Sequence, residues 1–197
     1  KVFYSWFDAP IGYIGITIDA MDDWKEWWKD DKNVKLVQFM GKDNIPFHTI
    51  MFPSFLIGAK DDYTLLYTIS STEYLNYESG KFSKSNKTGV FGDDAMSTGI
   101  PSDIFRYYLL YNRPETSDTE FSWKDFQERN NSELLANLGN FVNRTLSFIN
   151  SSFDRKVSAP ELGSSEEDFL EKLDKEIQKY KDMMEKIQLR EGIRQIL

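Results

Sequence analysis

The stretch that decides the fold class is Val34-Lys35-Leu36-Val37-Gln38-Phe39-Met40-Gly41-Lys42-Asp43-Asn44. Its first seven residues are mostly apolar and predict a strand, which runs directly into Gly41 and Asp43 and then into a helical stretch at 46–58. Open α/β sheets bind ligands at such strand–loop–helix units, outside the carboxyl ends of their strands. A second apolar run at 65–69 predicts another buried strand. Parallel strands separated by a helix indicate part of a doubly wound sheet.

The segments on either side predict shorter elements. Residues 2–6 are aromatic and β-branched and predict a strand, which residues 8–12 break. Residues 21–33 predict a short surface helix that carries three tryptophans. Residues 73–92 are rich in turn formers and predict short strands. The first third of the chain is therefore predicted to be α/β.

The remainder is predicted to be mainly helical. Pro101 fits the first turn of a helix that continues to residue 110. Residues 114–131 are predicted to be a connecting stretch, anchored by the apolar side chains of Phe121, Trp123 and Phe126.

From Ser132 onward the apolar residues recur at helical spacing, with a linker at 154–165. Ser164 and Glu167 have the spacing of a capping box, which predicts the start of a second amphipathic helix.

Composition excludes several classes of protein. The 197 residues include 32 acidic and 24 basic ones and no cysteine. Disulfides and thiolate metal sites are thereby excluded, and no metal site is expected. No run of 18 apolar residues predicts a membrane span. The acidic excess is spread over both halves, so we expect no DNA partner and no basic nucleic-acid arm.

A short basic segment, Gly80-Lys81-Phe82-Ser83-Lys84-Ser85, interrupts this acidic chain. Glycine allows the backbone to bend toward an anion, and two ammonium groups with two hydroxyls suit a polyphosphate. The segment lacks the spacing of a Walker P-loop. Its alternative interpretation is a solvated turn between two strands.

The chain has one histidine, His48. Asn44, His48 and Phe52 are four residues apart and would share one face of a helix. From spacing alone, a hydrogen-bonded structural histidine is the simpler interpretation. Asn140 and Arg144 are also four apart, and their simple interpretation is an exposed polar helix face.

Four segments in order carry a resemblance to a known family. They are 3–13 (Phe-Tyr-Ser-Trp-Phe-Asp-Ala-Pro-Ile-Gly-Tyr), 39–48 (beginning Phe-Met-Gly-Lys-Asp and ending Phe-His), 72–85 (from Thr-Glu-Tyr-Leu-Asn to Lys-Phe-Ser-Lys-Ser) and 103–108 (Asp-Ile-Phe-Arg-Tyr-Tyr). A weaker match lies at 140–144. In these segments the chain resembles the class I aminoacyl-tRNA synthetases, and among them the methionyl-tRNA synthetases. The resemblance covers nearly the whole chain.

The resemblance implies an aminoacyl-tRNA ligase. Methionine would attack the α-phosphate of ATP, bound with Mg²⁺, to give methionyl-adenylate, and the methionyl group would pass to tRNA(Met). It implies Lys84 as the main catalytic cation and Lys81 as its helper. The ATP-binding residues that it implies are Gly41, Asp43, Glu73, Leu75, Lys81, Ser83, Lys84 and Ser85. The methionine-binding residues are Trp6, Ala9, Pro10, Tyr13, Asn44, His48 and Phe52, and the anticodon pair is Asn140 and Arg144.

The chain also departs from the family pattern. The His-Ile-Gly-His signature needs two histidines, and the zinc-binding insertion needs cysteines. We therefore expect the second half of a Rossmann-like catalytic fold (1–72), a signature-loop and stem-contact subdomain (73–131) and part of an α-helical anticodon-binding bundle (132–197). This fragment is expected to be inactive by itself and to come from a cytoplasmic enzyme. The alternatives are a noncatalytic tRNA-binding or assembly module on the same scaffold, and a sister synthetase for another apolar amino acid.

Overall fold

The computed structural model describes residues 5–30, 32–78, 80–83, 85–157, 159 and 161–197. They fall into two compact units, Lys1–Tyr74 and Leu75–Leu197. Each unit is described by itself. The expected three-part division of the chain stays a prediction.

The first unit is built on two parallel strands. β1 (Leu36–Gly41) pairs with β2 (Leu66–Thr72), with Leu36 opposite Leu66 and Gly41 opposite Thr72. Between them the chain forms a 3₁₀ turn η2 (Lys42–Asn44), a π-helical turn η3 (Phe47–Met51) and helix α3 (Phe52–Ala59). The predicted strand–loop–helix unit and the parallel pairing are confirmed, as is the α/β fold class.

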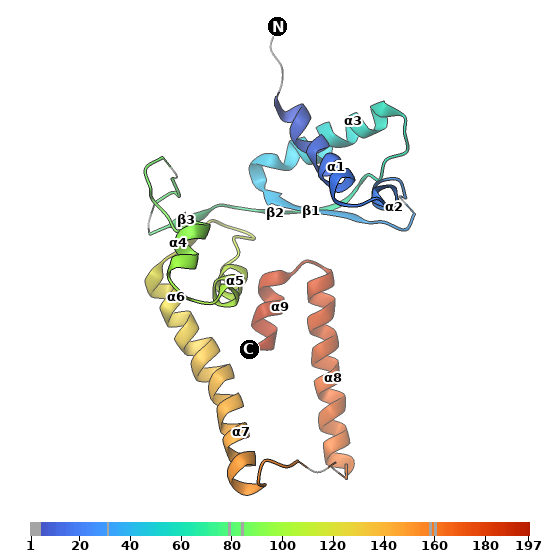
Figure 1. Cartoon of the computed structure of the whole chain (residues 1–197). Helices are drawn as coiled ribbons and strands as arrows, with labels where there is room; N and C mark the ends of the chain where they lie inside the picture. The colour runs from blue at the N-terminus through green and yellow to red at the C-terminus, as the bar shows by residue number, and fades with distance from the viewer. Residues whose placement is uncertain (1–4, 31, 79, 84, 158, 160) are drawn as a thin grey trace. The chain divides into compact units, whose positions relative to one another are not determined.

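Helices α1 (Asp8–Ala20) and α2 (Trp24–Trp28) precede the strands, and in Figure 1 α1 and α3 lie above β1 and β2. Their core side chains are Ile14, Trp28, Phe52 and Leu56. Because the two strands are parallel, their carboxyl ends lie at the same edge of the sheet, with Gly41 opposite Thr72.

Two predictions near the N-terminus are wrong. Residues 8–12 do not break a strand but begin α1, since a proline at the third residue of a helix still lies in the first turn, where no backbone N–H is needed. Ser5–Phe7 form a 3₁₀ turn, and residues 2–4 of the predicted strand lie outside the described part. A helix does form within 21–33, but it covers only Trp24–Trp28 and buries Trp28, whose indole N–H donates to Thr17 Oγ1 at 3.0 Å.

The second unit begins with an aromatic core. β3 (Leu75–Tyr77) pairs in parallel with β4 (Thr119–Phe121), and α4 (Gly92–Ser97), α5 (Ser102–Tyr111) and α6 (Trp123–Arg129) pack around them. Tyr108, Phe121 and Phe126 are its buried side chains. The predicted connecting stretch 114–131 is thus partly wrong. The stretch holds β4, which pairs with β3, and α6. Ser122 Oγ caps α6 by accepting from the N–H of Asp125 at 3.1 Å.

The chain then continues through a π-helical segment η4 (Asn130–Gly139), α7 (Asn140–Ser152), α8 (Ser164–Glu185) and α9 (Leu189–Ile196). The cap of α8 differs from the predicted one by a residue, because the N–H of Gly163 donates to Glu166 at 3.1 Å. The predicted second helix ends before Ile187, whose φ of 60° breaks it from α9. Among the described residues, no helix is long and apolar enough to cross a membrane.

Candidate active site at the strand ends and the signature loop

Two polar segments meet where β1 and β2 end. Lys42 forms an ion pair with Glu73, and the hydroxyl of Tyr74 donates to Asp43 Oδ2. The Nζ of Lys42 also lies 4.6 Å from the centre of the Tyr74 ring. The structure therefore brings together three predicted ATP-binding residues, Gly41, Asp43 and Glu73, at the edge where parallel sheets bind ligands.

A buried histidine joins α1 to the turn after β1. His48 is 4% exposed, and its Nδ1 lies 2.9 Å from the carbonyl oxygen of Asn44. A carbonyl only accepts, so Nδ1 carries the proton, and in a neutral imidazole Nε2 then accepts from the Tyr13 hydroxyl at 3.0 Å. Both ring nitrogens are thus engaged, and the chain holds the imidazole in one orientation.

Aromatic rings surround this histidine. Trp6 stacks on Phe47 with ring centres 4.1 Å apart, and Tyr13 meets the edge of Phe52 at 6.1 Å. Phe52 is 1% exposed. Pro10 is buried on α1 and Ala9 is exposed beside it. Among the predicted methionine-binding residues, Tyr13 therefore contacts both His48 and Phe52, and His48 contacts Asn44. Trp6 contacts Phe47, the residue before His48.

The signature loop lies in the second unit and has a rigid base. Ser83 and Thr88 exchange two backbone hydrogen bonds, of 2.8 and 2.9 Å, and Tyr77 and Gly80 form a second bridge. Phe82 packs against Tyr77, with ring centres 5.3 Å apart, and both rings pack against the buried aromatic core of this unit. Lys81 and Ser85 are exposed, and Ser83 Oγ lies 3.3 Å from Ser85 Oγ. Lys84, the principal predicted cation, lies outside the described residues.

A glycine that the sequence analysis missed closes this loop. Gly89 has φ of +137°, and a Cβ there would lie 2.3 Å from Cδ1 of Phe82. Only glycine tolerates both the backbone angle and the contact. Leu75, another predicted ATP contact, is paired with Thr119 in the adjoining strand.

The chain is similar to known proteins over most of its length. Residues 1–146 match the family described as tRNA synthetases class I (M). The chain belongs to the class I tRNA synthetases. Among its relatives are the probable cytoplasmic methionine–tRNA ligase of Dictyostelium discoideum (55% identity, 98% of this chain, 27% of the relative) and the cytoplasmic methionine–tRNA ligase of Xenopus laevis (55%, 100% and 22%).

A solved structure agrees in fold. Mycobacterium tuberculosis methionyl-tRNA synthetase bound by methionyl-adenylate matches with a TM-score of 0.79 and 23% identity over 99% of this chain and 37% of that one. This synthetase chain spans about a quarter of the length of the curated relatives named above.

The predicted anticodon pair of the synthetase chain lies one helical turn apart on α7. Asn140 and Arg144 are both exposed and border an open hollow of about 820 Å³, whose wall includes Phe141 and Phe148.

Two tyrosines on α5 have raised pKa values. Burial raises the pKa of Tyr107 to about 12, and Glu133 adds to the shift. Burial and the hydrogen bond to Asp125 also raise the pKa of Tyr108. Both phenols are therefore neutral at physiological pH. Tyr108 donates a hydrogen bond to Asp125, whereas the buried Tyr107 hydroxyl has no hydrogen-bond partner among the described residues.

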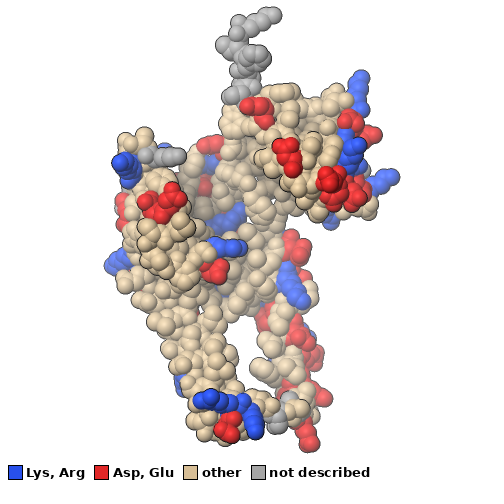
Figure 2. Space-filling view, in the orientation of Figure 1, with Lys and Arg blue, Asp and Glu red and all other residues tan. Residues whose placement is uncertain are grey.

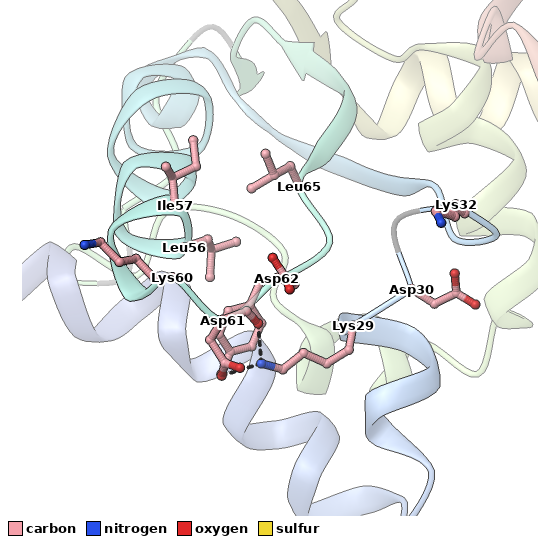
Figure 3. A pocket seen from close by; sticks show the side chains of 10 residues that line it. Lys29, Asp30, Lys32, Leu56, Ile57, Lys60, Asp61, Asp62 and Leu65 are labelled. Carbon is pink, nitrogen blue, oxygen red and sulfur yellow. Dashed lines mark hydrogen bonds and ion pairs between the residues drawn. The ribbon is translucent and has the colours of Figure 1, made fainter.

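The synthetase chain also has a charged hollow that contains none of the predicted site residues. It encloses about 650 Å³ between α2 and the loop after α3 (Figure 3). Lys29 pairs with Asp61 there and lies 3.6 Å from the centre of the Tyr63 ring. On the face drawn in Figure 2, acidic and basic side chains are interspersed in each unit. The ion pair ties the end of α2 to the loop between α3 and β2, which makes this hollow a part of the scaffold.

Two neighbours of the predicted site were overlooked. Lys42 and Tyr74 are adjacent in sequence to Asp43 and Glu73, and their position after parallel strands could have signalled their role. The described residues hold no group of three or more His, Cys, Asp or Glu side chains that could bind a metal ion.

Proposed function

We propose that the full-length protein is a methionine–tRNA ligase, which activates methionine with ATP and transfers it to tRNA(Met). The observation that carries the proposal is the Tyr13–His48–Asn44 hydrogen-bond chain within an aromatic surround, in a class I synthetase fold. The names of the relatives support it, since those compared above are methionine–tRNA ligases. The cytoplasmic location that several relatives' names state is proposed with it.

In the proposed reaction the carboxylate of methionine attacks the α-phosphorus of ATP. The new oxygen–phosphorus bond forms as the bond to the β-phosphate breaks, which gives methionyl-adenylate and pyrophosphate. No protein base is needed, because the nucleophile is already ionised. Lys84 and Lys81 would stabilise the charge that develops on pyrophosphate, and Mg²⁺ would arrive with the phosphates of ATP. A hydroxyl of the terminal ribose of tRNA then forms an ester bond to the methionyl carbonyl carbon, as the bond from that carbon to the phosphate oxygen breaks and AMP and the hydroxyl proton are released.

The aromatic rings near His48 suit the thioether of methionine. Sulfur is polarisable and makes favourable contacts with ring edges, and Trp6, Tyr13 and Phe52 offer such rings. His48 would shape the pocket, since two hydrogen bonds hold its imidazole in one orientation, and the reaction asks no proton transfer of it because the nucleophile is already ionised. Asn140 and Arg144 are proposed to contact the anticodon through their exposed polar groups.

The proposal is tested by methionine-dependent ATP–pyrophosphate exchange in the full-length protein. We expect exchange with methionine to exceed that with leucine, isoleucine or valine, and aminoacylation of tRNA(Met) to follow. Exchange that favours one of the other amino acids would favour a sister synthetase. Binding of tRNA without exchange would favour the noncatalytic module.

Tyr13→Phe is expected to raise the KM for methionine by about three- to tenfold, the effect of losing one neutral hydrogen bond. The phenol ring stays, but His48 Nε2 loses its donor and the imidazole is less firmly oriented. The turnover number should change little, because the phosphates are bound elsewhere. Steady-state exchange kinetics measure both constants.

The matched control is Tyr67→Phe, since Tyr67 is a 63% exposed tyrosine on β2. An equal rise in the KM for methionine in both variants would contradict the role of Tyr13.

A further inference from the structure

The ends of β1 and β2 are joined by four side chains that form a continuous chain of contacts. Asp43 accepts from the Tyr74 hydroxyl, and the Tyr74 ring lies under the ammonium group of Lys42, which pairs with Glu73. The contacts link residues 31 positions apart in sequence. Because both strands end here, Tyr74, which follows β2, contacts the residues that follow β1.

Asp43 needs such a partner if it is to recognise a ligand. It is exposed and stands in the short 3₁₀ turn η2, where packing does not fix its carboxylate. A carboxylate that rotates freely loses side-chain entropy when it binds. The Tyr74 hydroxyl occupies Oδ2, and within the described residues Oδ1 has no hydrogen-bond partner. The arrangement leaves one oxygen, in a defined direction, for a hydroxyl donor.

Lys42 in turn restrains Tyr74 and Glu73. A cation 4.6 Å from the ring centre favours one ring orientation, and the ion pair with Glu73 fixes the ammonium group. Lys42 and Glu73 are each about one-third exposed, so the ion pair adds geometric restraint more than stability. The positions of Asp43 and Glu73 are therefore coupled through Tyr74 and Lys42.

We propose that Tyr74 is a positioning residue for nucleotide recognition, whose hydroxyl directs the carboxylate of Asp43 toward a ribose hydroxyl of ATP. The inference rests on the proposed function for the identity of the nucleotide. Tyr74 itself touches Asp43 and not the ligand. Its effect should therefore exist only while Asp43 is present.

A double-mutant cycle on ATP binding tests this dependence. In the full-length protein, the dissociation constant for ATP is measured by titration calorimetry for the wild type, Tyr74→Phe, Asp43→Ala and the double variant. Tyr74→Phe alone should weaken ATP binding about three- to tenfold, the range of a typical net hydrogen bond, because the Tyr74–Asp43 bond is exposed to water. In the Asp43→Ala background the same change should have almost no effect.

The ribose gives a second readout that a purely structural role would not move. The wild type should bind ATP more tightly than 2′-deoxy-ATP or 3′-deoxy-ATP, and Tyr74→Phe should reduce that preference. Tyr63→Phe is the matched control, because its ring also lies beside a lysine ammonium group, that of Lys29, at 3.6 Å. It should leave both the ATP affinity and the ribose preference unchanged.

Each outcome decides the proposal. Equal effects of Tyr74→Phe with and without Asp43 would overturn it, as would unchanged ATP affinity or a loss of thermal stability that also weakens methionine binding. If the protein binds ATP without methionine-dependent exchange, the proposed function fails, while the double-mutant cycle still tests the role of Tyr74. If it does not bind ATP, both fail.

Discussion

Lys84→Ala in the full-length protein is expected to slow methionine-dependent ATP–pyrophosphate exchange by about two to three orders of magnitude. Methionine affinity should change little, because the proposed pocket lies on α1 and the turn after β1. A cation that acts mainly on the departing pyrophosphate stabilises the transition state more than the bound substrates. Lys81→Ala should give a smaller loss of the same kind.

The base of the loop makes this substitution informative. Ser83 and Thr88 are bonded to each other through their backbones, and Phe82 is inserted against Tyr77. None of these contacts uses the side chain of residue 84. If these contacts persist in the variant, a loss of rate reflects the missing charge.

Pre-steady-state measurement of adenylate formation gives the rate, and equilibrium titration gives the methionine affinity. Lys87→Asn is the control, since Lys87 is an exposed lysine of the same loop at φ of 53°, an angle that asparagine accepts. It should retain most of the rate. A Lys84→Ala variant that loses rate and methionine affinity by equal factors would contradict the assigned role.

Phe121→Ala is expected to lower the free energy of unfolding of the second unit by about 3–5 kcal/mol. Phe121 is 4% exposed and packs against Tyr77, Tyr108, Trp123 and Phe126, with ring centres 5.3–6.0 Å away. Removal of the ring leaves a cavity at the centre of the only aromatic cluster that the described part of this unit buries.

Urea denaturation of the 197-residue chain, followed by far-UV circular dichroism, measures the change. Phe169→Ala is the matched control, because Phe169 on α8 is 64% exposed and should shift the free energy by less than about 0.5 kcal/mol. Similar destabilisation by the two variants would show that Phe121 is not a core residue.

The sequence predicted those parts of the fold in which local pattern and packing agree. The apolar run at 34–40 contains most of β1, in which exposed Val37 and Phe39 alternate with less exposed neighbours, and Leu36 packs against the helix core. The run at 65–69 contains the first part of β2, which pairs with β1. Residues 8–12 were predicted wrongly because proline and glycine are usually breakers, whereas here Pro10 lies in a first helical turn and is buried.

For the candidate site, spacing along a helix grouped Asn44, His48 and Phe52, and the structure shows hydrogen bonds or ring contacts that connect all three to each other or to Tyr13. Long-range partners were not predictable. The Tyr74–Asp43 contact depends on the register between two strands, and the need for glycine at position 89 depends on where the Phe82 ring packs. Both are properties of the assembled chain and leave no periodic signal.

Phe82 packs against the aromatic core of the second unit, so we expect the loop to unfold together with that core. The amides of Ser83 and Thr88 are hydrogen-bonded to each other across the bridge. Their exchange with solvent deuterium should require opening of the core around Phe121, and should be slower than in the highly exposed helix α8. The proposed phosphate-binding segment would then lose its shape in the same event that unfolds the core, and any weakening of that core would lower the fraction of molecules in which the loop keeps its shape.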